Sequence, residues 1–225
     1  GIDREPKQCG TENGVQTLAE KQVYATDVEA VGLEGTRCEI HVGEEAFDVT
    51  IPIAGEHNVY NALAATCVAR QLGLSNAEIK RGIEAVETIG GRSNLIHKDG
   101  ITVIDDCYNA NPVSMKASVD VLSHAPGRKI AVLGDMGELG ADERALHAMV
   151  GAHFAGKHID ALFCTGTLSE EIAKAVREKS PDTSVFYFTN KEELIESLKN
   201  YRKTGDTILV KASHFMGFSD IVKAM

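Results

Sequence analysis

After about residue 100, short apolar segments alternate with longer amphipathic segments, and this pattern limits the possible folds more than any other feature. We expect strands over 101–105, 129–134, 160–164, 184–189 and 206–211, and helices over 112–123, 141–155, 168–179, 190–202 and 215–224. Strands that alternate with helices form βαβ units, in which the strands run parallel and helices cover the sheet. The sequence therefore predicts an α/β fold with a Rossmann-like, doubly wound, mostly parallel sheet.

The preceding part of the chain has a different pattern. Three strands are expected over 22–31, 36–42 and 46–53, and two helices over 58–72 and 75–87. Ser75 and Glu78 have the spacing of a capping box at the start of the second helix. A hairpin pair, 93–98 and 101–105, turns at Asp99-Gly100. Gly90-Gly91 is interpreted as a hinge, which predicts two domains, 1–90 and 91–225.

Composition limits the partners and the compartment. The net charge of −10 opposes nonspecific binding to nucleic acid, and no apolar run is long enough to span a bilayer. The five cysteines are odd in number and lack Cys-x-x-Cys spacing, so neither a zinc site nor a disulfide framework is supported. We therefore expect a cytoplasmic protein with reduced thiols, no nucleic-acid partner and no membrane association.

Polar residues gather where the predicted strands end. In open α/β sheets the carboxyl ends of the strands bind ligands, so these positions are candidates for a site. The same residue types also build turns and helix caps, which is the competing structural interpretation. The candidates are Asp105, Asp106, Tyr108-Asn109-Ala110-Asn111-Pro112, Gly134-Asp135-Met136, Thr165-Gly166, Thr189-Asn190 and Lys211-Ala212-Ser213.

Two asparagines open the first predicted helix of the N-terminal part. Asn58 and Asn61 are three residues apart and therefore share a helix face. Their amides offer both donors and acceptors, which suits a purine edge or an anion at the helix N-terminus. The alternative is that Asn58 only caps the helix.

Four segments resemble the Mur ligases. They are GEHNVYNALAA at 55–65, IDDCYNANPVSM at 104–115, AVLGDMGELG at 131–140 and LVKAS at 209–213. Within that family they are most similar to the group that joins D-alanyl-D-alanine to UDP-N-acetylmuramoyl-tripeptide. The resemblance covers the chain from about residue 20 onward.

The resemblance implies a reaction and its participants. ATP, with Mg²⁺, activates a precursor carboxylate as an acyl phosphate, and the amine of D-Ala-D-Ala attacks it during peptidoglycan synthesis. The small-molecule partners are then UDP-N-acetylmuramoyl-tripeptide, D-Ala-D-Ala and ATP, and the enzyme is expected to be a monomer. Residues 1–90 would correspond to the C-terminal part of the central ATP-binding domain, and 91–225 to the C-terminal Rossmann-like ligase domain.

The resemblance also implies roles for individual residues. The nucleotide ligands would be His57, Asn58, Asn61, Arg92 and Asp106. The substrate would contact Tyr108, Asn109, Ser114 and Ser213, and catalysis would involve Asn109, Asn111 and Lys211. No metal ligand is assigned.

The chain departs from the family pattern at several places. Glu56, Ala212 and His214 replace the residues usual in the family. The sequence also contains no G-x-x-x-x-G-K-[ST] phosphate loop. The expected explanation is that the phosphate loop lies upstream, so that this chain is a C-terminal portion that is inactive alone.

Three other functions fit parts of the pattern. A receiver domain would use an acidic pair such as Asp105-Asp106 and a lysine such as Lys211, but Cys164 stands where its phosphoacceptor aspartate is needed. A folylpolyglutamate synthetase-like ligase shares the superfamily, but the YNANP motif argues against it. A noncatalytic module is supported only by the missing phosphate loop.

Two further side chains near these motifs are open to interpretation. Cys107 is expected to be a small packed residue, because the adjacent acid raises a thiol pKa. His147, on the predicted helix 141–155, is expected to be structural or to lie at the rim of the site.

Overall fold

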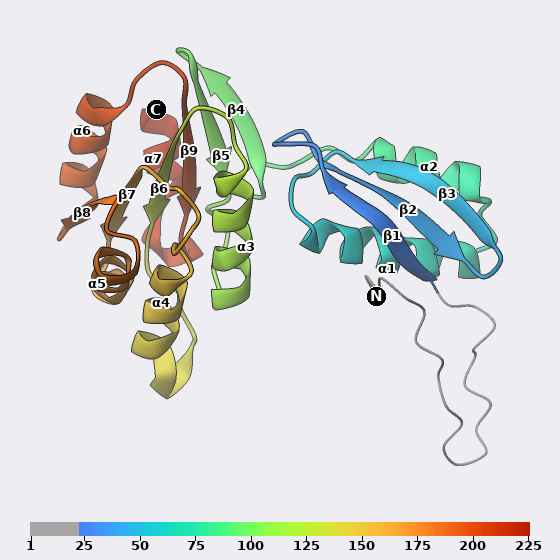
Figure 1. The fold of residues 1–225 in the computed structure, drawn as a ribbon, viewed down its shortest axis with the longest axis horizontal. Coiled ribbons are helices and arrows are strands. Elements are labelled where there is room, and N and C mark those ends of the chain that lie inside the picture. Colours follow the sequence, from blue (N-terminus) through green and yellow to red (C-terminus); the bar gives the residue numbers. More distant parts are fainter. Residues whose placement is uncertain (1–22) are drawn as a thin grey trace. The chain divides into compact units, whose positions relative to one another are not determined.

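The computed structural model describes residues 23–225, and these form two compact units. The division falls between Glu87 and Thr88. The predicted domain 1–90 includes residues 1–22, which lie outside the described residues. Figure 1 labels the helices and strands of both units.

The N-terminal unit contains an antiparallel sheet with strands in chain order, against which two helices pack. Phe47, Val49, Ile51 and Ile53 all contribute to its core, as their period-two alternation predicts. The capping box is present, because the Ser75 hydroxyl accepts from Glu78 N and the Glu78 carboxylate accepts from Ser75 N. The elements are β1 (Val23–Ala30), β2 (Thr36–Val42), β3 (Glu45–Ile51), α1 (His57–Gln71) and α2 (Asn76–Glu84).

The C-terminal unit is built on a six-stranded sheet in the order β4-β5-β9-β6-β7-β8. Only β4 is antiparallel to its neighbour, and it forms the predicted hairpin with β5. The other strand pairs are parallel, which confirms the predicted fold class. The strands are β4 (Asn94–Lys98), β5 (Ile101–Asp105), β6 (Arg128–Leu133), β7 (Ala161–Thr165), β8 (Ser184–Phe188) and β9 (Asp206–Lys211).

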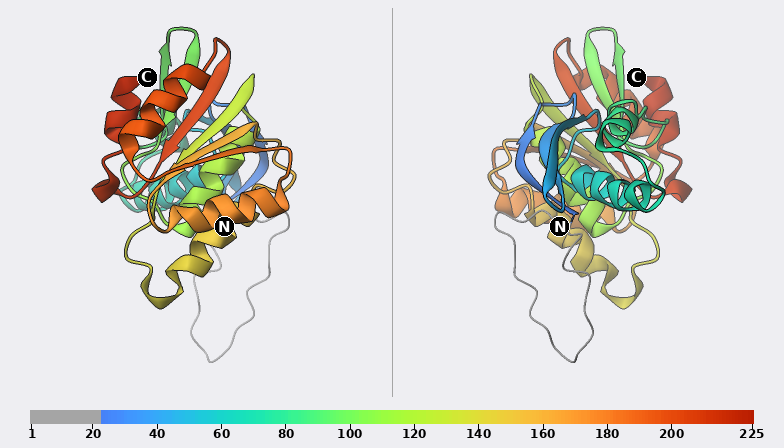
Figure 2. Two further views of the ribbon diagram at one scale, coloured as in Figure 1. Left: turned by 90° about the vertical axis from the view of Figure 1, so that its left-hand side faces the viewer. Right: turned by 90° about the vertical axis from the view of Figure 1, so that its right-hand side faces the viewer.

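Helices cover both faces of this sheet (Figure 2). Three of them, α3, α4 and α5, pack side by side on one face, and α6 and α7 pack together on the other. Their bounds are α3 (Pro112–Ser123), α4 (Glu143–Ala152), α5 (Ser169–Lys179), α6 (Lys191–Tyr201) and α7 (Ser219–Ala224).

The order of the strands creates a switch point around β9. The connection from β5 to β6 runs through α3 and passes over β9, which lies between those two strands. After β9 the chain turns to α7 on the opposite face. Ligands of open α/β sheets bind where successive connections leave toward opposite faces. The topology therefore predicts a ligand site at the carboxyl ends of β5, β9 and β6.

The last predicted helix, 215–224, is wrong in its first half. Residues His214–Met216 form a 3₁₀ turn, and α7 begins only at Ser219. Gly217 separates the two with a positive φ of 61°. A left-handed residue ends a helix rather than continuing it, and glycine adopts that conformation at no steric cost.

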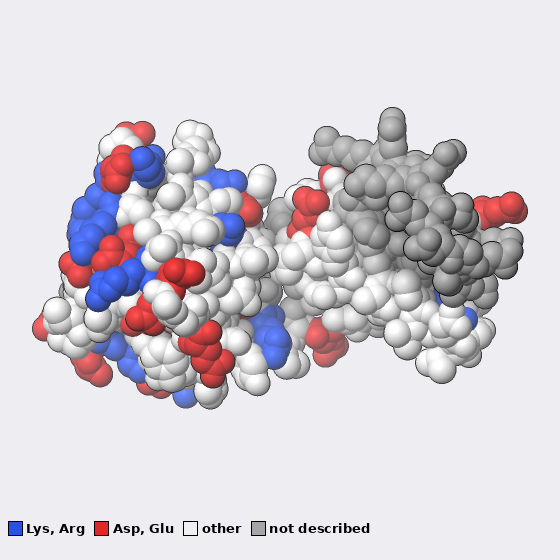
Figure 3. All heavy atoms as spheres, turned by 90° about the horizontal axis from the view of Figure 1, so that it is seen from below, with Lys and Arg blue, Asp and Glu red and all other residues white. Residues whose placement is uncertain are grey.

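Charged side chains of both signs are interspersed on the face of the C-terminal unit shown in Figure 3. Lys174 pairs with Glu170 and Glu171, and Arg144 also pairs with Glu171. Exposed pairs of this kind contribute little to stability. None of the helices in the described part of the chain is long and apolar enough to cross a membrane.

We expect limited proteolysis to cut between residues 85 and 90. Val86 and Ile89 are exposed and lie outside secondary structure, whereas the Gly91 N–H is bonded to the Asp105 carboxylate. Exposed irregular backbone is the preferred site of nicking. Brief thermolysin treatment should leave a resistant fragment that starts near Ile89 and ends at Met225, identified by mass spectrometry. Degradation to small peptides without that fragment would contradict an independently stable C-terminal unit.

Candidate active site

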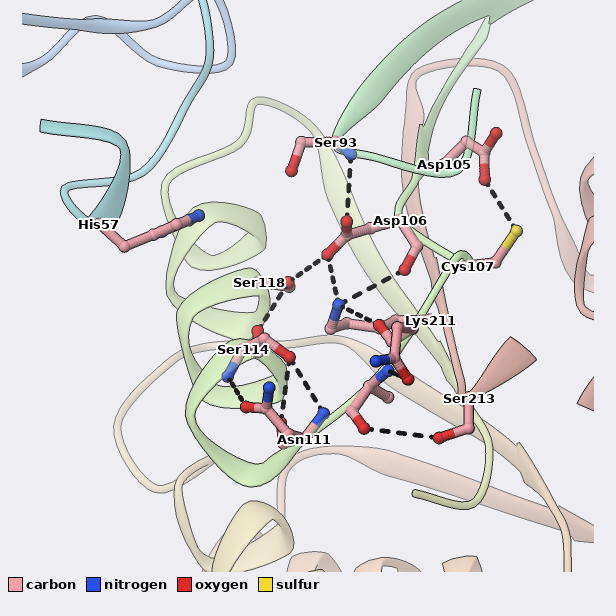
Figure 4. A network of polar contacts seen from close by, with 12 residues as sticks. His57, Ser93, Asp105, Asp106, Cys107, Asn111, Ser114, Ser118, Lys211 and Ser213 are labelled. Atoms are coloured by element: carbon pink, nitrogen blue, oxygen red, sulfur yellow. Dashed lines mark hydrogen bonds and ion pairs between the residues drawn. The ribbon is translucent and has the colours of Figure 1, made fainter. Parts of the chain in front are cut away.

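A buried ion pair lies at the centre of the switch point. Lys211, the last residue of β9, approaches Asp106, the residue after β5, with 2.7 Å between Nζ and Oδ2. The side chains are 3% and 15% exposed, so water screens the pair poorly. Figure 4 shows the contacts that converge on Asp106.

Lys211 uses all of its hydrogen-bond donors on its own chain. Besides Asp106 Oδ2, its Nζ donates to the backbone carbonyls of Asn109 at 3.0 Å and Asp106 at 3.4 Å. An ammonium has three N–H groups, so none remains for a substrate in this conformation. Lys211 therefore fixes the loop after β5 onto the end of β9.

Asp106 is nearly saturated as an acceptor. Its Oδ1 accepts from Ser93 N at 3.1 Å, and its Oδ2 accepts from Ser118 Oγ and Lys211, both at 2.7 Å. A carboxylate offers about four lone-pair positions, so one position on Oδ1 is left. Asp106 can therefore accept one further hydroxyl group.

Arg92 stacks on the Tyr108 ring beside this centre, and the His214 ring lies tilted by 51° to that of Tyr108. The Arg92 guanidinium carbon lies 4.2 Å from the centroid of the Tyr108 ring, and the His214 ring lies 5.7 Å from it. Tyr108 is about half exposed, so the stack has an accessible edge. An arginine held on an aromatic face keeps most of its N–H donors available for an anion.

The YNANP loop caps the helix that follows it. Asn111 Oδ1 accepts from Ser114 N at 2.9 Å, and Ser114 Oγ accepts from Asn111 N at 3.1 Å, with Pro112 in the first turn. This is a capping box, which confirms that Asn111 and Ser114 serve as helix-capping residues. Asn109 differs, because its side chain is exposed. The side-chain Oδ1 accepts from Ala110 N at 2.8 Å, and no contact within the described residues involves the side-chain Nδ2.

Ser213 joins the three loops of the site. Its hydroxyl accepts from Gly137 N at 2.8 Å and donates to Ala110 O at 3.4 Å, while its own N–H donates to Asp135 O at 3.0 Å. Gly137 follows β6 and Ala110 follows β5. Ser213, after β9, therefore connects the carboxyl ends of all three strands at the switch point.

The loop after β6 is held from the helix side as well. His147 Nε2 accepts from Met136 N at 2.9 Å, and its Nδ1 lies 2.7 Å from Glu143 O. Because Met136 N can only donate, the ring proton must lie on Nδ1 and bond Glu143 O. His147 is fully buried, which confirms the structural interpretation and excludes a place at the rim.

Asp135 acts on a different helix. Its carboxylate accepts from Leu168 N and Ser169 N, at 3.1 and 2.7 Å, and from the Ser169 hydroxyl. These amides begin α5, so Asp135 caps that helix from the end of β6 and offsets its positive terminus. The loop after β6 is thus bonded to both β9 and α5.

In the N-terminal unit, the predicted pair of asparagines is linked. Asn61 Nδ2 donates to Asn58 Oδ1 at 3.1 Å, and Asn58 Nδ2 lies 3.0 Å from Ala54 O and 3.3 Å from His57 Nε2. The capping alternative for Asn58 is wrong, because the N-cap is Glu56 and no side chain caps α1. Asn61 is exposed and keeps its amide oxygen available at the helix start.

Cys107 is a packed residue at the turn, as expected. It is 7% exposed, and its thiol donates to Asp105 Oδ1 at 3.0 Å. Burial, followed by the Asp105 carboxylate, raises the pKa of the thiol to about 12. The thiol therefore stays protonated at neutral pH and is a poor nucleophile.

The sequence did not predict the roles of Ser93 and Ser118, nor the contact of His147 with the backbone of Met136. Ser118 could have been found, because it lies one helical turn after Ser114 and therefore on the same face of α3. Ser93 and His147 act through contacts between distant segments, for which the sequence contains no local signal. Within residues 23–225, no group of three or more His, Cys, Asp or Glu residues is placed to hold a metal ion.

Comparison with known proteins places this site in a family. Residues 91–214 match the family described as Mur ligase, glutamate ligase domain, and residues 7–69 match the Mur ligase middle domain. The UDP-N-acetylmuramoyl-tripeptide–D-alanyl-D-alanine ligase of Bacillus subtilis is 37% identical over 193 residues, which cover 84% of this chain and 42% of that protein. The chain thus spans less than half the length of this relative.

Solved structures agree with the sequence matches. MurF from Acinetobacter baumannii has a TM-score of 0.77 and 32% identity, over 89% of this chain and 44% of that one. MurF from Thermotoga maritima, solved in complex with ADP, has a TM-score of 0.75 and 26% identity, over 90% and 45% of the two chains. A folylpolyglutamate synthase from Thermotoga maritima shares the fold alone, at 17% identity and a TM-score of 0.56, over 87% and 45%. The chain belongs to the Mur ligase family.

Proposed function

We propose that this chain forms part of an ATP-dependent ligase that adds D-Ala-D-Ala to UDP-N-acetylmuramoyl-tripeptide in peptidoglycan synthesis. In this reaction ATP converts the tripeptide carboxylate into an acyl phosphate. The dipeptide amine then attacks the acyl carbon, a C–N bond forms, and inorganic phosphate leaves. The proposal includes a cytoplasmic, monomeric enzyme with domains at 1–90 and 91–225.

The observation that carries this proposal is the loop after β5. This loop contains the sequence DDCYNANP. Three interactions fix it at the switch point: the Asp106–Lys211 ion pair, the bond from Ser213 and the helix cap formed by Asn111. The Bacillus subtilis relative that matches this chain is named as a UDP-N-acetylmuramoyl-tripeptide–D-alanyl-D-alanine ligase. A motif whose residues are rigidly fixed at the expected ligand edge is a stronger argument than the motif alone.

We assign the nucleotide to polar atoms that remain available in each unit. In the C-terminal unit, Asp106 Oδ1 would accept one ribose hydroxyl, and Arg92 would contact phosphate oxygens from its place on Tyr108. In the N-terminal unit, the amide oxygen of Asn61 suits the adenine amino group, while Asn58 and His57 orient it. We propose no Mg²⁺ ligand among the described residues, although the reaction would need the ion.

The acceptor dipeptide is assigned to the loop after β5. Asn109 is exposed and its amide nitrogen is available, so we propose that it touches the dipeptide or the acyl phosphate, together with Tyr108. Asn111, Ser114, Lys211 and Ser213 are occupied by contacts within the chain, so their proposed role is to position that loop. Of the three residues that the family resemblance assigns to catalysis, we therefore retain only Asn109, whose amide nitrogen is available.

Two substitutions in the whole enzyme should separate the substrates. Asp106→Asn should raise the KM for ATP by about 10- to 150-fold, the equivalent of about 1.5–3 kcal/mol, because a charged acceptor is lost. Asn109→Ala should raise the KM for D-Ala-D-Ala instead. Steady-state kinetics with each substrate varied in turn measures both.

Asp99→Asn is the matched control, since it makes the same change in the exposed turn at the other end of β5. It should leave both constants unchanged. If Asp106→Asn and Asn109→Ala also behave like the wild type, the assignment of these residues is refuted. Thermal unfolding of each variant separates a kinetic effect from a loss of folded protein.

The receiver-domain alternative has no support in the geometry. Cys164, where a receiver needs its phosphoacceptor aspartate, is fully buried in β7 and bonds the Phe186 carbonyl. Burial also raises the pKa of this thiol to about 12.

A further inference from the structure

The loop after β6 contains a strained glutamate. Glu138 has a positive φ of 60°, and in the described part of the chain the other non-glycine residues with positive φ are Asp27, Ser93, Asp99 and His158. Aspartate and histidine are enriched in this conformation, whereas glutamate is not. Strained backbone that persists in a rigid setting concentrates at functional sites.

The residues before Glu138 are held at every step. Gly134 N donates to Lys211 O, Met136 N donates to His147 Nε2, and Gly137 N donates to Ser213 Oγ. Gly134 also has no room for a side chain, because an added Cβ would lie 2.5 Å from Phe218. The chain therefore reaches Glu138 in a fixed direction, and the surrounding contacts maintain its strained conformation.

Glu138 follows Gly137, which is one of the residues bonded to Ser213 where the loops after β5, β6 and β9 meet. Its Cα is one peptide unit, about 3.8 Å, from that of Gly137, whose N–H is bonded to Ser213. The side chain is exposed, and no hydrogen bond or ion pair reaches its carboxylate from the described residues. The carboxylates at positions 105, 106 and 135 in the same region are all engaged within the chain.

We propose that Glu138 binds the ammonium end of the acceptor dipeptide. This deepens the proposed function, on which it rests, by naming the residue that recognises the amine. An exposed carboxylate on a rigid loop attracts a cation and repels the phosphates and carboxylates of the other substrates. An ammonium satisfies it with one contact, whereas a divalent cation prefers several oxygen ligands, and no such cluster exists in the described part of the chain.

The test uses two variants of the whole enzyme. Glu138→Gln keeps the shape and removes the charge, and Glu138→Gly removes the side chain together with the backbone strain. Both should raise the KM for D-Ala-D-Ala at least 10-fold and leave the KM for ATP within twofold of the wild-type value. Glu138→Gly should also keep or raise the Tm, because glycine adopts positive φ freely. Weaker acceptor binding in an equally stable protein is not expected if Glu138 is merely structural.

The matched control is Asp142→Asn, which neutralises an exposed carboxylate four residues further along and should change neither KM. A dipeptide KM within twofold of wild type in both Glu138 variants overturns the proposal. An equal rise in the KM values of ATP and dipeptide also overturns it, since that indicates general distortion. A wild-type enzyme that does not use D-Ala-D-Ala at all contradicts the proposed function instead, so the two failures are distinguishable.

His147 provides a second test of the same loop. His147→Phe removes the acceptor for Met136 N, while Gln can present an amide oxygen in its place. If the loop directs Glu138, Phe should raise the dipeptide KM more than the ATP KM, and Gln should restore most of the difference. A His147→Phe enzyme that is less stable but has an unchanged dipeptide KM would contradict the positioning role of this loop.

Discussion

Replacing Lys211 by alanine should destabilise the C-terminal unit by about 3–5 kcal/mol, the cost of leaving a buried charge without its partner. Asp106 would keep its bonds from Ser93 N and Ser118 Oγ but lose the ammonium at 2.7 Å. The carbonyl of Asn109 would lose its donor too. Denaturant unfolding of the 225-residue chain, compared with wild type, measures this change in the free energy of unfolding.

The controls separate the ion pair from side-chain volume. Lys199→Ala, at an exposed position of α6, should change stability little. The double variant Asp106→Asn with Lys211→Met should be more stable than Lys211→Ala, because no unpaired charge remains buried. Equal stabilities for Lys211→Ala and Lys199→Ala would show that the pair does not hold this loop.

The 225-residue chain by itself should release no phosphate from ATP. Phosphoryl transfer depends on backbone amides, a lysine and magnesium that hold the phosphates, and a glycine-rich loop at a helix N-terminus usually supplies the first two. This sequence has no G-x-x-x-x-G-K-[ST] motif. The atoms assigned above would hold adenine, ribose and one phosphate at most, so ATP binding should be weak.

The measurement combines calorimetry with a phosphate-release assay. The chain is incubated with ATP, Mg²⁺ and D-Ala-D-Ala, and phosphate is compared with a blank that lacks protein. Phosphate release in proportion to the chain would contradict the prediction and would require a phosphate site that neither the sequence nor the described residues indicate.

The strands and helices could be predicted because their signals are local. The two-residue periodicity of apolar residues predicted β3 and the face that it buries in the core. The spacing of Ser75 and Glu78 predicted the capping box that the structure contains. The prediction was wrong at 215–224, where apolar residues on both sides of Gly217 suggested one helix. Glycine is compatible with either a helix interior or a helix end, so the pattern alone did not decide.

The sequence predicted where the site lies, but not which of its polar side chains are available to a ligand and which are bonded within the chain. The strand-end rule led to Asp106, Asn109 and Lys211, which the fold does bring together. Whether a polar side chain is available or already bonded depends on partners far away in sequence, such as the 105 positions that separate Asp106 from Lys211. Residue type and local spacing contain no information about those partners.

The most direct test of the proposed function is ligation by the whole protein that contains this chain. The enzyme is given UDP-N-acetylmuramoyl-tripeptide, ATP and Mg²⁺, with either D-Ala-D-Ala or L-glutamate as the only acceptor, and the products are identified by mass spectrometry. We expect the pentapeptide product and an equal amount of inorganic phosphate with D-Ala-D-Ala, and no ligation with glutamate. Ligation of glutamate without ligation of the dipeptide would contradict the proposed function.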